Sequence, residues 1–453
     1  MIQEDCGVMG AYDFDGNDVV YDLYHGLYSL QHRGQESCGI VTNAYVKLNT
    51  VKGYGLVNEV FNKENLASLK GKLGVGHVQY GSTDENDAIP PIVSRYVKGT
   101  MTVAMNGFIT NYDELRVKLE ARGVIFQSTS HTEMIMNMIA IARTQTHSAE
   151  EAVLAAVEQL NGAYCIIVMS PKKLIAVRDP YGFRPLSVGK RGNRYFFSSE
   201  TAAFDVIRAE RLYDVKPGEL IKIDENGLTH YTDRVGKVAP APCIFEYVYF
   251  ARPDSYLDDG KSVYRARIDI GKALYKACPA DADMVVGVPD SGLHFAQGYS
   301  YASGIPYGTG LVKNSYVGRT FIRNTDEIRY EAVSIKLNAL RGAVEGKNIV
   351  LVDDSIVRGT TSANLIKLMK DGGAKQVHMR IASPPFLWKC KYGTDIPDRE
   401  HLIAARMSLE DIKNHLGADS LGYLPIEAFE DIGLSLKDHC AACFTGKYPD
   451  ETK

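Results

Sequence analysis

The chain has 453 residues, of which 45% are hydrophobic and 23% are charged, and its formal net charge is −4. This length allows two or three domains, each with its own core. The slightly acidic balance gives no argument for a nucleic acid or an anionic membrane as partner. No apolar run approaches the roughly 20 residues of a membrane-spanning helix, and the acidic residues 1–5 do not resemble a signal peptide. We therefore expect a cytoplasmic protein.

The first half of the chain has the pattern of many strands and a few helices. Apolar residues at helical spacing predict helices over 19–30, 113–122, 132–143 and 149–160. Short apolar runs predict strands at 7–12, 39–48, 73–80, 101–106, 164–169, 174–177 and 195–199. Residues 219–231 predict a hairpin that turns at Glu225-Asn226-Gly227. The segment 236–243, with its two prolines, predicts a crossing between domains.

Strands and helices alternate in the second half. Apolar strands are predicted at 284–288, 349–352 and 377–382. A helix is predicted after Gly292, and another from about Ala363 to residue 371, where Gly372-Gly373 ends it. This order is typical of a doubly wound parallel sheet in an α/β domain.

The most specific motif follows the strand at 349–352. Two carboxylates, Asp353 and Asp354, come first, and a short loop continues with Ser355, Arg358, Gly359, Thr360, Thr361 and Ser362. Ligands bind at the carboxyl ends of parallel strands, and a helix N-terminus attracts phosphate. The carboxylates can hold ribose hydroxyls or a metal-bound sugar, and the loop can hold a 5′-phosphate. The motif resembles the phosphoribosyl pyrophosphate (PRPP) site of type I phosphoribosyltransferases; the alternative is an ordinary acidic turn.

Two further segments can complete such a site. Pro289-Asp290-Ser291-Gly292 lies between a strand and a helix, so its amides can bind a second anionic group, although a plain turn is the alternative. The stretch from Lys313 to Thr320 contains two cations, Lys313 and Arg319, as a lid over a pyrophosphate would. The alternative for this stretch is a solvated loop.

Nearly the entire chain is similar to the glutamine PRPP amidotransferase family, and residues 246–255, 304–307 and 417–424 add to the motifs above. The resemblance implies a two-domain α/β protein. Residues 6–235 would form an N-terminal-nucleophile hydrolase domain, an αββα sandwich, after a propeptide at 1–5. Residues 243–453 would form the type I phosphoribosyltransferase domain.

The same resemblance implies the reaction and its partners. PRPP and glutamine would yield 5-phosphoribosylamine, pyrophosphate and glutamate, the first step of de novo purine synthesis. An amine would attack C1 of PRPP with help from Mg²⁺, held by Ser291, Asp353 and Asp354. Purine nucleotides are implied as possible inhibitors, and the family is usually a homotetramer or a homodimer.

Eight cysteines in a cytosolic chain of this length indicate metal binding or catalysis rather than a disulfide scaffold. Cys440 and Cys443 form a C-x-x-C pair, which alone can be redox-active, structural or incidental. With Cys243 and Cys390 they make a four-thiolate set that suits zinc or an iron–sulfur cluster, and spacing does not choose between them. Similarity to the iron–sulfur branch of the family implies a structural 4Fe–4S cluster.

The family resemblance also assigns roles in the first half. Cys6 would be the nucleophile, and its α-amine, freed by removal of the leader, would be the general base, since an α-amine has a pKa of about 7.7–8.0. Asn106-Gly107 matches the oxyanion-hole segment, where the Asn side chain and the Gly amide receive the developing negative charge.

Two positions depart from the family pattern. Gln79 stands where the family has an Arg that pairs with the glutamine α-carboxylate, and His131 stands where it has an Asp that receives the α-ammonium. Each charge-assisted hydrogen bond contributes roughly 1.5–3 kcal/mol. Losing both would weaken glutamine binding on the order of 10²- to 10⁴-fold.

These departures leave three functional hypotheses open. The first is an ordinary member of the family in which nearby residues compensate. The second is a relative that uses ammonia or a different amide because its glutaminase half is impaired. A PRPP- or nucleotide-sensing protein without chemistry is the third. Against the third, the pyrophosphate loop, the lid and the paired Asp residues are all present, and no basic patch suggests DNA.

Overall fold

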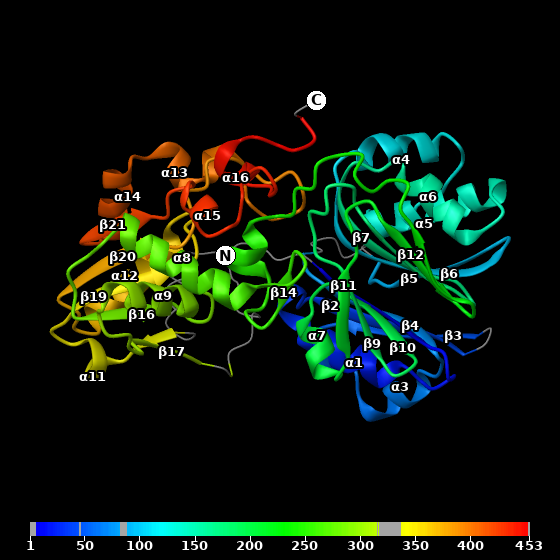
Figure 1. Cartoon of the computed structure of the whole chain (residues 1–453), viewed down its shortest axis with the longest axis horizontal. Coiled ribbons are helices and arrows are strands. Elements are labelled where there is room, and N and C mark those ends of the chain that lie inside the picture. The colour runs from blue at the N-terminus through cyan, green and yellow to red at the C-terminus, as the bar shows by residue number, and fades with distance from the viewer. Residues whose placement is uncertain (1–5, 45–46, 82–87, 315, 317–336, 452–453) are drawn as a thin grey trace.

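The computed structural model describes residues 6–44, 47–81, 88–314, 316 and 337–451. Two lobes lie side by side (Figure 1). Two sheets, built from strands between residues 7 and 231, form the first lobe, and a parallel sheet between residues 284 and 423 forms the second. The domain boundaries at 6–235 and 243–453 stay a prediction.

Two antiparallel sheets face each other in the first lobe. The seven-stranded sheet has the order β11-β9-β10-β1-β4-β2-β3. Its strands are β1 (Gly7–Asp13), β2 (Ser37–Ala44), β3 (Lys47–Tyr54), β4 (Leu73–Gln79), β9 (Ser187–Arg191), β10 (Arg194–Ser198) and β11 (Glu210–Asp214). The six-stranded sheet has the order β13-β12-β8-β7-β6-β5. Its strands are β5 (Ile92–Tyr96), β6 (Gly99–Ile109), β7 (Gly162–Met169), β8 (Leu174–Arg178), β12 (Leu220–Asp224) and β13 (Gly227–Tyr231).

Helices cover the outer face of each sheet (Figure 1). The seven-stranded sheet carries α1 (Val20–Ser29), the one-turn η1 (Gln31–Arg33), α2 (Val57–Val60), α3 (Lys63–Ser68) and α7 (Ala202–Val206). The six-stranded sheet carries α4 (Tyr112–Glu120), α5 (His131–Gln145) and α6 (Ala149–Val157). Apolar side chains such as Val8, Ala104 and Ile167 fill the space between the sheets. The predicted αββα sandwich is therefore confirmed.

The second lobe is a parallel sheet of order β16-β19-β20-β21, formed by β16 (Met284–Gly287), β19 (Asn348–Asp353), β20 (Gln376–Ile381) and β21 (Ser420–Tyr423). Helices α8 (Val263–Ala277) and α9 (Leu293–Ser303) pack on the face that carries Val285 and Val350. Helices α12 (Thr360–Asp371) and α14 (Leu409–Leu416) pack on the face of Val286 and Leu351. Because side chains alternate along a strand, both faces are buried. The predicted doubly wound sheet is confirmed.

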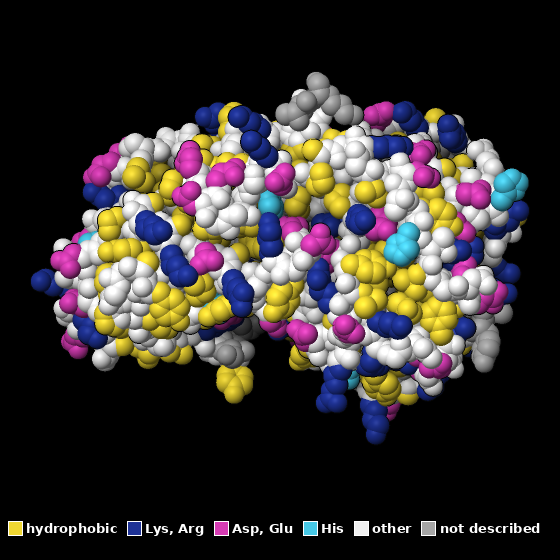
Figure 2. Space-filling model, viewed as in Figure 1, with side chains coloured by type: hydrophobic (Ala, Val, Ile, Leu, Met, Phe, Trp, Pro, Cys, Tyr) yellow, Lys and Arg dark blue, Asp and Glu magenta, His cyan; other side chains and the backbone are white. Residues whose placement is uncertain are grey.

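Short elements complete the second lobe. They are η2 (Glu246–Phe250), β14 (Tyr256–Leu257), β15 (Lys261–Ser262), β17 (Leu311–Lys313), β18 (Leu337–Ala339), α11 (Arg341–Val344), η3 (Arg399–His401), α13 (Ile403–Arg406), α15 (Ala428–Asp431) and α16 (Ala442–Thr445). Basic and acidic side chains are interspersed on the face drawn in Figure 2. Within the described ranges, no helix is both long and apolar enough to cross a membrane.

The predicted elements are mostly confirmed, but some differ in extent and others were missed. The strand predicted at 39–48 was wrong in extent, because β2 ends at Ala44 and β3 begins at Lys47. Several elements were not predicted from the sequence, among them strands β3, β5, β9, β11 and β21, the short strands β14, β15, β17 and β18, and helix α8. The helix predicted from about Ala363 begins at Thr360, directly after Gly359, which has φ of +87° and turns the chain into the helix.

Candidate active sites

Cys6 lies directly before β1, at the centre of the seven-stranded sheet, and is half-buried. Strand β1 pairs with β4 so that Gly7 faces Val78. This antiparallel register brings Cys6 next to Gln79, the last residue of β4. Two predicted site residues that are distant in the sequence thus lie at the same end of two neighbouring strands.

Asn106 and Gly107 lie in β6, the strand of the opposite sheet that contacts both β1 and β4. The Asn106 side chain is fully buried, and neither its oxygen nor its nitrogen has a hydrogen-bond partner among the described residues. Leaving a buried amide unpaired costs about 1–3 kcal/mol, so this side chain is suited to a ligand's developing charge. Gly107 has φ of +134°, and a Cβ there would lie 2.1 Å from the Ala163 carbonyl oxygen.

His77 supports this segment from β4. Its Nε2 lies 3.0 Å from the carbonyl oxygen of Met105, the residue before Asn106. Burial lowers the pKa of His77 to about 4, although the bond to Met105 opposes the shift. The ring is therefore neutral at physiological pH and donates from Nε2 to the carbonyl. It anchors the strand without adding charge.

The two residues that depart from the family pattern are both held by hydrogen bonds. Gln79 accepts from the Ser37 hydroxyl at 2.7 Å through Oε1. His131 is the first residue of α5, and its Nδ1 accepts from the backbone N–H of Ile109 at 3.0 Å. Through Ile109 the His131 ring is tied to the strand that carries Asn106-Gly107.

The predicted PRPP residues of the second lobe come together at the carboxyl edge of the parallel sheet. Strands β16 and β19 are neighbours, with Gly287 opposite Val352. The loops that follow them therefore lie side by side, and the Val288 N–H donates to the Val352 carbonyl at 2.9 Å. Gly292 is packed so closely that a Cβ would lie 2.4 Å from the same carbonyl oxygen. Neighbouring strands thus unite the two loops.

Asp353 and Asp354 are buried at this edge. Burial raises the pKa of Asp353 well above its usual value, and the neighbouring Asp354 charge adds to the rise. Burial also raises the pKa of Asp354, although hydrogen bonds from Ser291 and Ser355 and the charge of Arg267 work against the rise. Two buried carboxylates whose charges are only partly compensated are suited to a cation or to sugar hydroxyls.

The remaining residues of the predicted site lie on the adjoining loops, on β17 and at the start of α12. Asp290 forms an ion pair with Lys313, which ends β17. Arg358 and Thr361 are exposed, whereas Ser362 is buried. Because α12 begins at Thr360, the residues Thr360, Thr361 and Ser362 belong to its first turn and not to the loop, so the predicted loop was too long. Arg319 lies outside the described residues.

The four predicted cluster cysteines line one pocket between α16 and the 390–396 segment. Cys243 and Cys440 form an isolated β-bridge, and the Ile244 N–H donates to the Cys440 carbonyl at 3.1 Å. Burial raises the pKa of the Cys443 thiol well above its usual value, and the other three cysteines add to the rise. Among the described residues, no three His, Cys, Asp or Glu side chains are close enough to bind a single metal ion.

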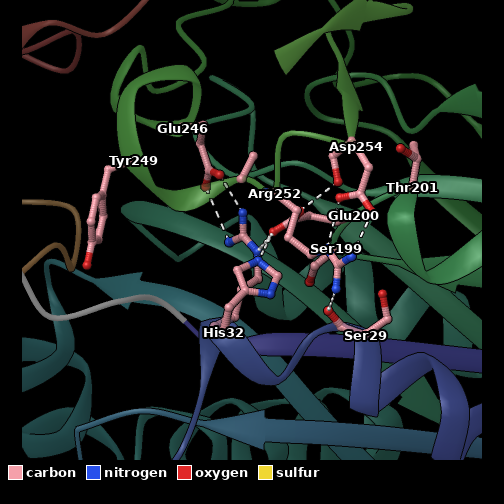
Figure 3. Close-up of polar contacts among 12 residues, drawn as sticks. Ser29, His32, Ser199, Glu200, Thr201, Glu246, Tyr249, Arg252 and Asp254 are labelled. Atoms are coloured by element: carbon pink, nitrogen blue, oxygen red, sulfur yellow. Dashed lines mark hydrogen bonds and ion pairs between the residues drawn. The ribbon is translucent and has the colours of Figure 1, made fainter. Parts of the chain in front are cut away.

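A buried charge network between the lobes was not predicted from the sequence (Figure 3). Arg33 of the first lobe donates to Glu200 and to Glu246, which begins η2. His32 lies 2.6 Å from Glu200, and the backbone N–H of Arg252 donates to the same carboxylate at 2.8 Å. The sequence shows Arg33 and Glu246 only as isolated charged residues, the second inside the family-like stretch 246–255, and no local pattern pairs them.

Family profiles match both lobes. The profile described as a glutamine amidotransferase domain matches residues 78–206. The profile described as a phosphoribosyl transferase domain matches residues 255–382. Fold and profiles together define a glutamine amidotransferase joined to a phosphoribosyltransferase.

Similar proteins align over nearly the whole chain. An amidophosphoribosyltransferase of Methanothermobacter thermautotrophicus is 45% identical, and the alignment covers 99% of this chain and 95% of that protein. A Bacillus subtilis amidophosphoribosyltransferase is 42% identical, with the same coverage of 99% and 95%. The solved structure of the B. subtilis glutamine PRPP amidotransferase with ADP and GMP has a TM-score of 0.91, at 42% identity, covering 98% of this chain and 97% of that chain. The chain therefore belongs to the amidophosphoribosyltransferase family.

Proposed function

We propose that this chain forms 5-phosphoribosylamine and pyrophosphate from PRPP, with nitrogen released from an amide, in the first step of de novo purine synthesis. One observation carries the proposal: the Asp353-Asp354 pair and the 289–292 loop follow neighbouring parallel strands and lie side by side. In the same chain Cys6 directly precedes β1, a strand that contacts the β6 strand of Asn106-Gly107. The two loops of the second lobe are suited to a pyrophosphorylated sugar, and Cys6 with Asn106-Gly107 is suited to amide cleavage.

In the second lobe, ammonia attacks C1 of PRPP, the C1–O bond breaks, and pyrophosphate leaves. Asp353 and Asp354 hold the ribose hydroxyls, and the first turn of α12 with Arg358 binds the 5′-phosphate. Ser291, Asp353 and Asp354 would hold Mg²⁺, which neutralises the leaving pyrophosphate when bound. The raised pKa of both carboxylates fits a site that is completed by a cation.

In the first lobe, the Cys6 thiol attacks the amide carbon, and the α-amine of a Cys6 freed from its leader takes the thiol proton. The developing oxyanion is stabilised by the Asn106 side chain and the Gly107 N–H. The C–N bond breaks, ammonia leaves with that proton, and water hydrolyses the thioester to a carboxylic acid. The fully buried and unpaired Asn106 amide supports this role.

The four cysteines fit a 4Fe–4S cluster better than a zinc ion. Zinc draws four sulfur atoms to about 2.3 Å from one centre, whereas the described residues contain no group that could hold a single ion. All four thiols instead line one pocket, as the ligands of a larger group would. When bound, the cluster joins Cys243, Cys390, Cys440 and Cys443, and so fixes the C-terminal α16 to the start of the lobe.

Gln79 and His131 support a second candidate, a relative that uses free ammonia or a different amide. Neither side chain can carry the charge of the Arg and Asp at these positions of the family. A non-catalytic PRPP sensor is not supported, because the family relationship is that of enzymes.

We further infer a cytoplasmic homo-oligomer, a dimer or a tetramer, that purine nucleotides inhibit and that has no nucleic acid or membrane partner. The B. subtilis protein is complexed with ADP and GMP in its solved structure. A second solved structure, of 42% identity and TM-score 0.92, is described as the allosteric regulatory enzyme of purine biosynthesis. Both relatives support nucleotide control of this chain.

Pyrophosphate release from PRPP by anaerobically purified protein tests the proposal, with glutamine and with an ammonium salt in parallel. Turnover with glutamine would support the first candidate. Turnover with ammonium alone would favour the second. Release of no pyrophosphate with either donor would refute both, and the Asp354→Asn variant is the control for background hydrolysis.

A further inference from the structure

A turn of the first lobe forms one wall of the pocket that the four cysteines line. This turn, residues 179–184, directly follows β8, and its Phe183 and Arg184 side chains line the pocket together with the cysteines. The Phe183 ring stacks on the Tyr392 ring with centroids 4.0 Å apart, and the Phe183 carbonyl accepts from the Cys243 N–H at 3.1 Å. Both lobes therefore build this pocket.

Hydrogen bonds fix the conformation of this turn. The Asp179 carboxylate accepts from the N–H groups of Tyr181 and Gly182 at 2.9 and 2.7 Å. The Arg178 guanidinium donates to the carbonyls of Gly182 and Arg184 at 2.8 and 2.7 Å. Because the backbone of the turn is held in this way, the position from which the Arg184 side chain reaches the pocket is fixed.

The Arg184 side chain is a buried positive charge on the wall of the pocket, with 1% of its surface exposed. Its Nη2 donates to the Tyr392 carbonyl at 2.9 Å and to the Thr394 hydroxyl at 3.2 Å. Both partners follow Cys390 closely in the chain, so the guanidinium lies against the segment that carries a predicted cluster ligand. These two partners are neutral and do not balance the charge of Arg184.

The Glu246 carboxylate is an acidic neighbour of Arg184, but it is shared with a second guanidinium. Its Oε1 lies 3.9 Å from Nη1 of Arg184, whereas its contact with Arg33 is closer. A buried cation costs free energy unless anionic groups compensate its charge. Four thiolates outweigh the positive charge of an iron–sulfur core, so the occupied pocket would carry a net negative charge. An occupant of this kind would add to the compensation of Arg184.

Lys391 is the other cation among the described residues that line the pocket, and its environment differs from that of Arg184. Its side chain is 34% exposed and pairs with Glu451. Its Nζ lies 3.9 Å from the centroid of the Tyr448 ring. Because water and salt screen an exposed charge, Lys391 should act on the interior of the pocket less than a buried charge does. Lys391 therefore offers a matched control for Arg184.

From this geometry we propose that Arg184 supplies the buried positive charge that offsets the net negative charge of the thiolate-bound 4Fe–4S cluster. The inference rests on the proposed cluster and deepens it, because it makes a residue of the first lobe part of the cluster's surroundings. Reduction adds a negative charge to the cluster, and a nearby cation favours the reduced form. Arg184 should therefore raise the reduction potential of the cluster and slow its loss.

Stepwise reduction of the full-length, anaerobically purified protein with dithionite tests the proposal, with iron and sulfide content measured in parallel. Arg184→Gln removes the charge, whereas its amide can still donate to the Tyr392 carbonyl. We expect a more negative reduction potential and a loss of iron to a chelator that is about tenfold faster or more, because removing one partner of a buried pair is strongly destabilising. Arg184→Lys keeps the charge without the planar guanidinium, and its reduction potential should stay close to the wild-type value.

Lys391→Gln removes a positive charge from the lining of the same pocket at an exposed position, and it should leave both readouts at their wild-type values. An unchanged potential in Arg184→Gln would overturn the proposal, as would equal shifts in Arg184→Gln and Lys391→Gln. If Arg184→Gln holds no iron, retention of the cluster in Arg184→Lys would support the proposal, and loss in both variants would overturn it. Wild-type protein with neither iron nor sulfide would refute the cluster itself together with this inference.

Discussion

Arg33 of the first lobe and Glu246 of the second form a buried ion pair, with Nη1 of Arg33 3.4 Å from Oε1 of Glu246 and a closer contact between Nη2 and Oε2. Both side chains are almost inaccessible to solvent. Burial by itself lowers the pKa of Arg33, but the charges of Glu246 and Glu200 outweigh it and raise that pKa. A charge buried without its partner would destabilise the protein, so the interface between the lobes depends on both members of the pair.

Replacing Glu246 by Gln should weaken the interface strongly. Removal of one partner leaves the Arg33 charge buried and undercompensated, which costs about 3–5 kcal/mol for a buried pair. We expect a fall of several degrees in the midpoint of thermal unfolding. Asp254→Asn is the control, since its pair with Arg252 is exposed and should contribute at most about 1 kcal/mol. Equal melting of both variants would contradict a role for the buried network.

Because of the Asp353 carboxyl, the gain in protein stability on binding Mg²⁺ and PRPP should depend on pH. Its folded-state pKa is raised by burial and by Asp354. A raised pKa means that the carboxyl's contribution to stability is present at low pH and is lost as pH rises through that pKa. Mg²⁺ with PRPP should offset this loss by pairing the charge. The rise in melting temperature on adding Mg²⁺ and PRPP should therefore grow with pH.

The matched variants for this measurement are Asp353→Asn and Glu410→Gln. The first removes the titrating carboxyl and should abolish both the ligand effect and its pH dependence. The second removes an exposed carboxylate of α14 and should change neither. A ligand effect that shrinks as pH rises would show that the carboxylates stay charged in the free protein.

Local sequence patterns predicted the strands and helices whose buried faces appear as apolar patterns in the sequence. The apolar strand before Asp353 has both faces buried, so it is a continuous apolar run. Strand β3, an edge strand, is partly exposed along its length and has no such run, so it was missed. Arg33 and Glu246 are 213 residues apart, and only the packing of two lobes brings them together. The bond from the Ile109 N–H to the His131 ring is likewise a tertiary contact that no local pattern predicts.

Gly107→Ala should abolish amide cleavage and spare ammonium-dependent turnover. A Cβ would lie 2.1 Å from the Ala163 carbonyl oxygen, and φ of +134° strains any other residue. The shift of β6 needed to relieve this contact would displace the Asn106 amide and the residue 107 N–H. We expect a loss of about 10²-fold or more in ammonia release, as for removal of one oxyanion donor.

Gly99→Ala is the control in the same strand. Its φ is +123°, but a Cβ there meets nothing within 4 Å. It carries the backbone strain without the collision and lies at the far end of β6 from Asn106. Similar losses of amide cleavage in both variants would attribute the effect to strain in the strand and not to the oxyanion segment.

Cys443→Ser should remove the proposed iron–sulfur cluster. All four thiols line the same pocket, so loss of one ligand would leave the cluster with three ligands and open it to exchange. Anaerobic protein should contain about four iron and four sulfide per chain, and the variant should lose both and melt at a lower temperature. Cys278→Ser, at a thiol that bonds to the Tyr423 carbonyl outside this pocket, should keep the full iron content. About one zinc per chain without sulfide in the wild-type protein would instead identify a zinc site.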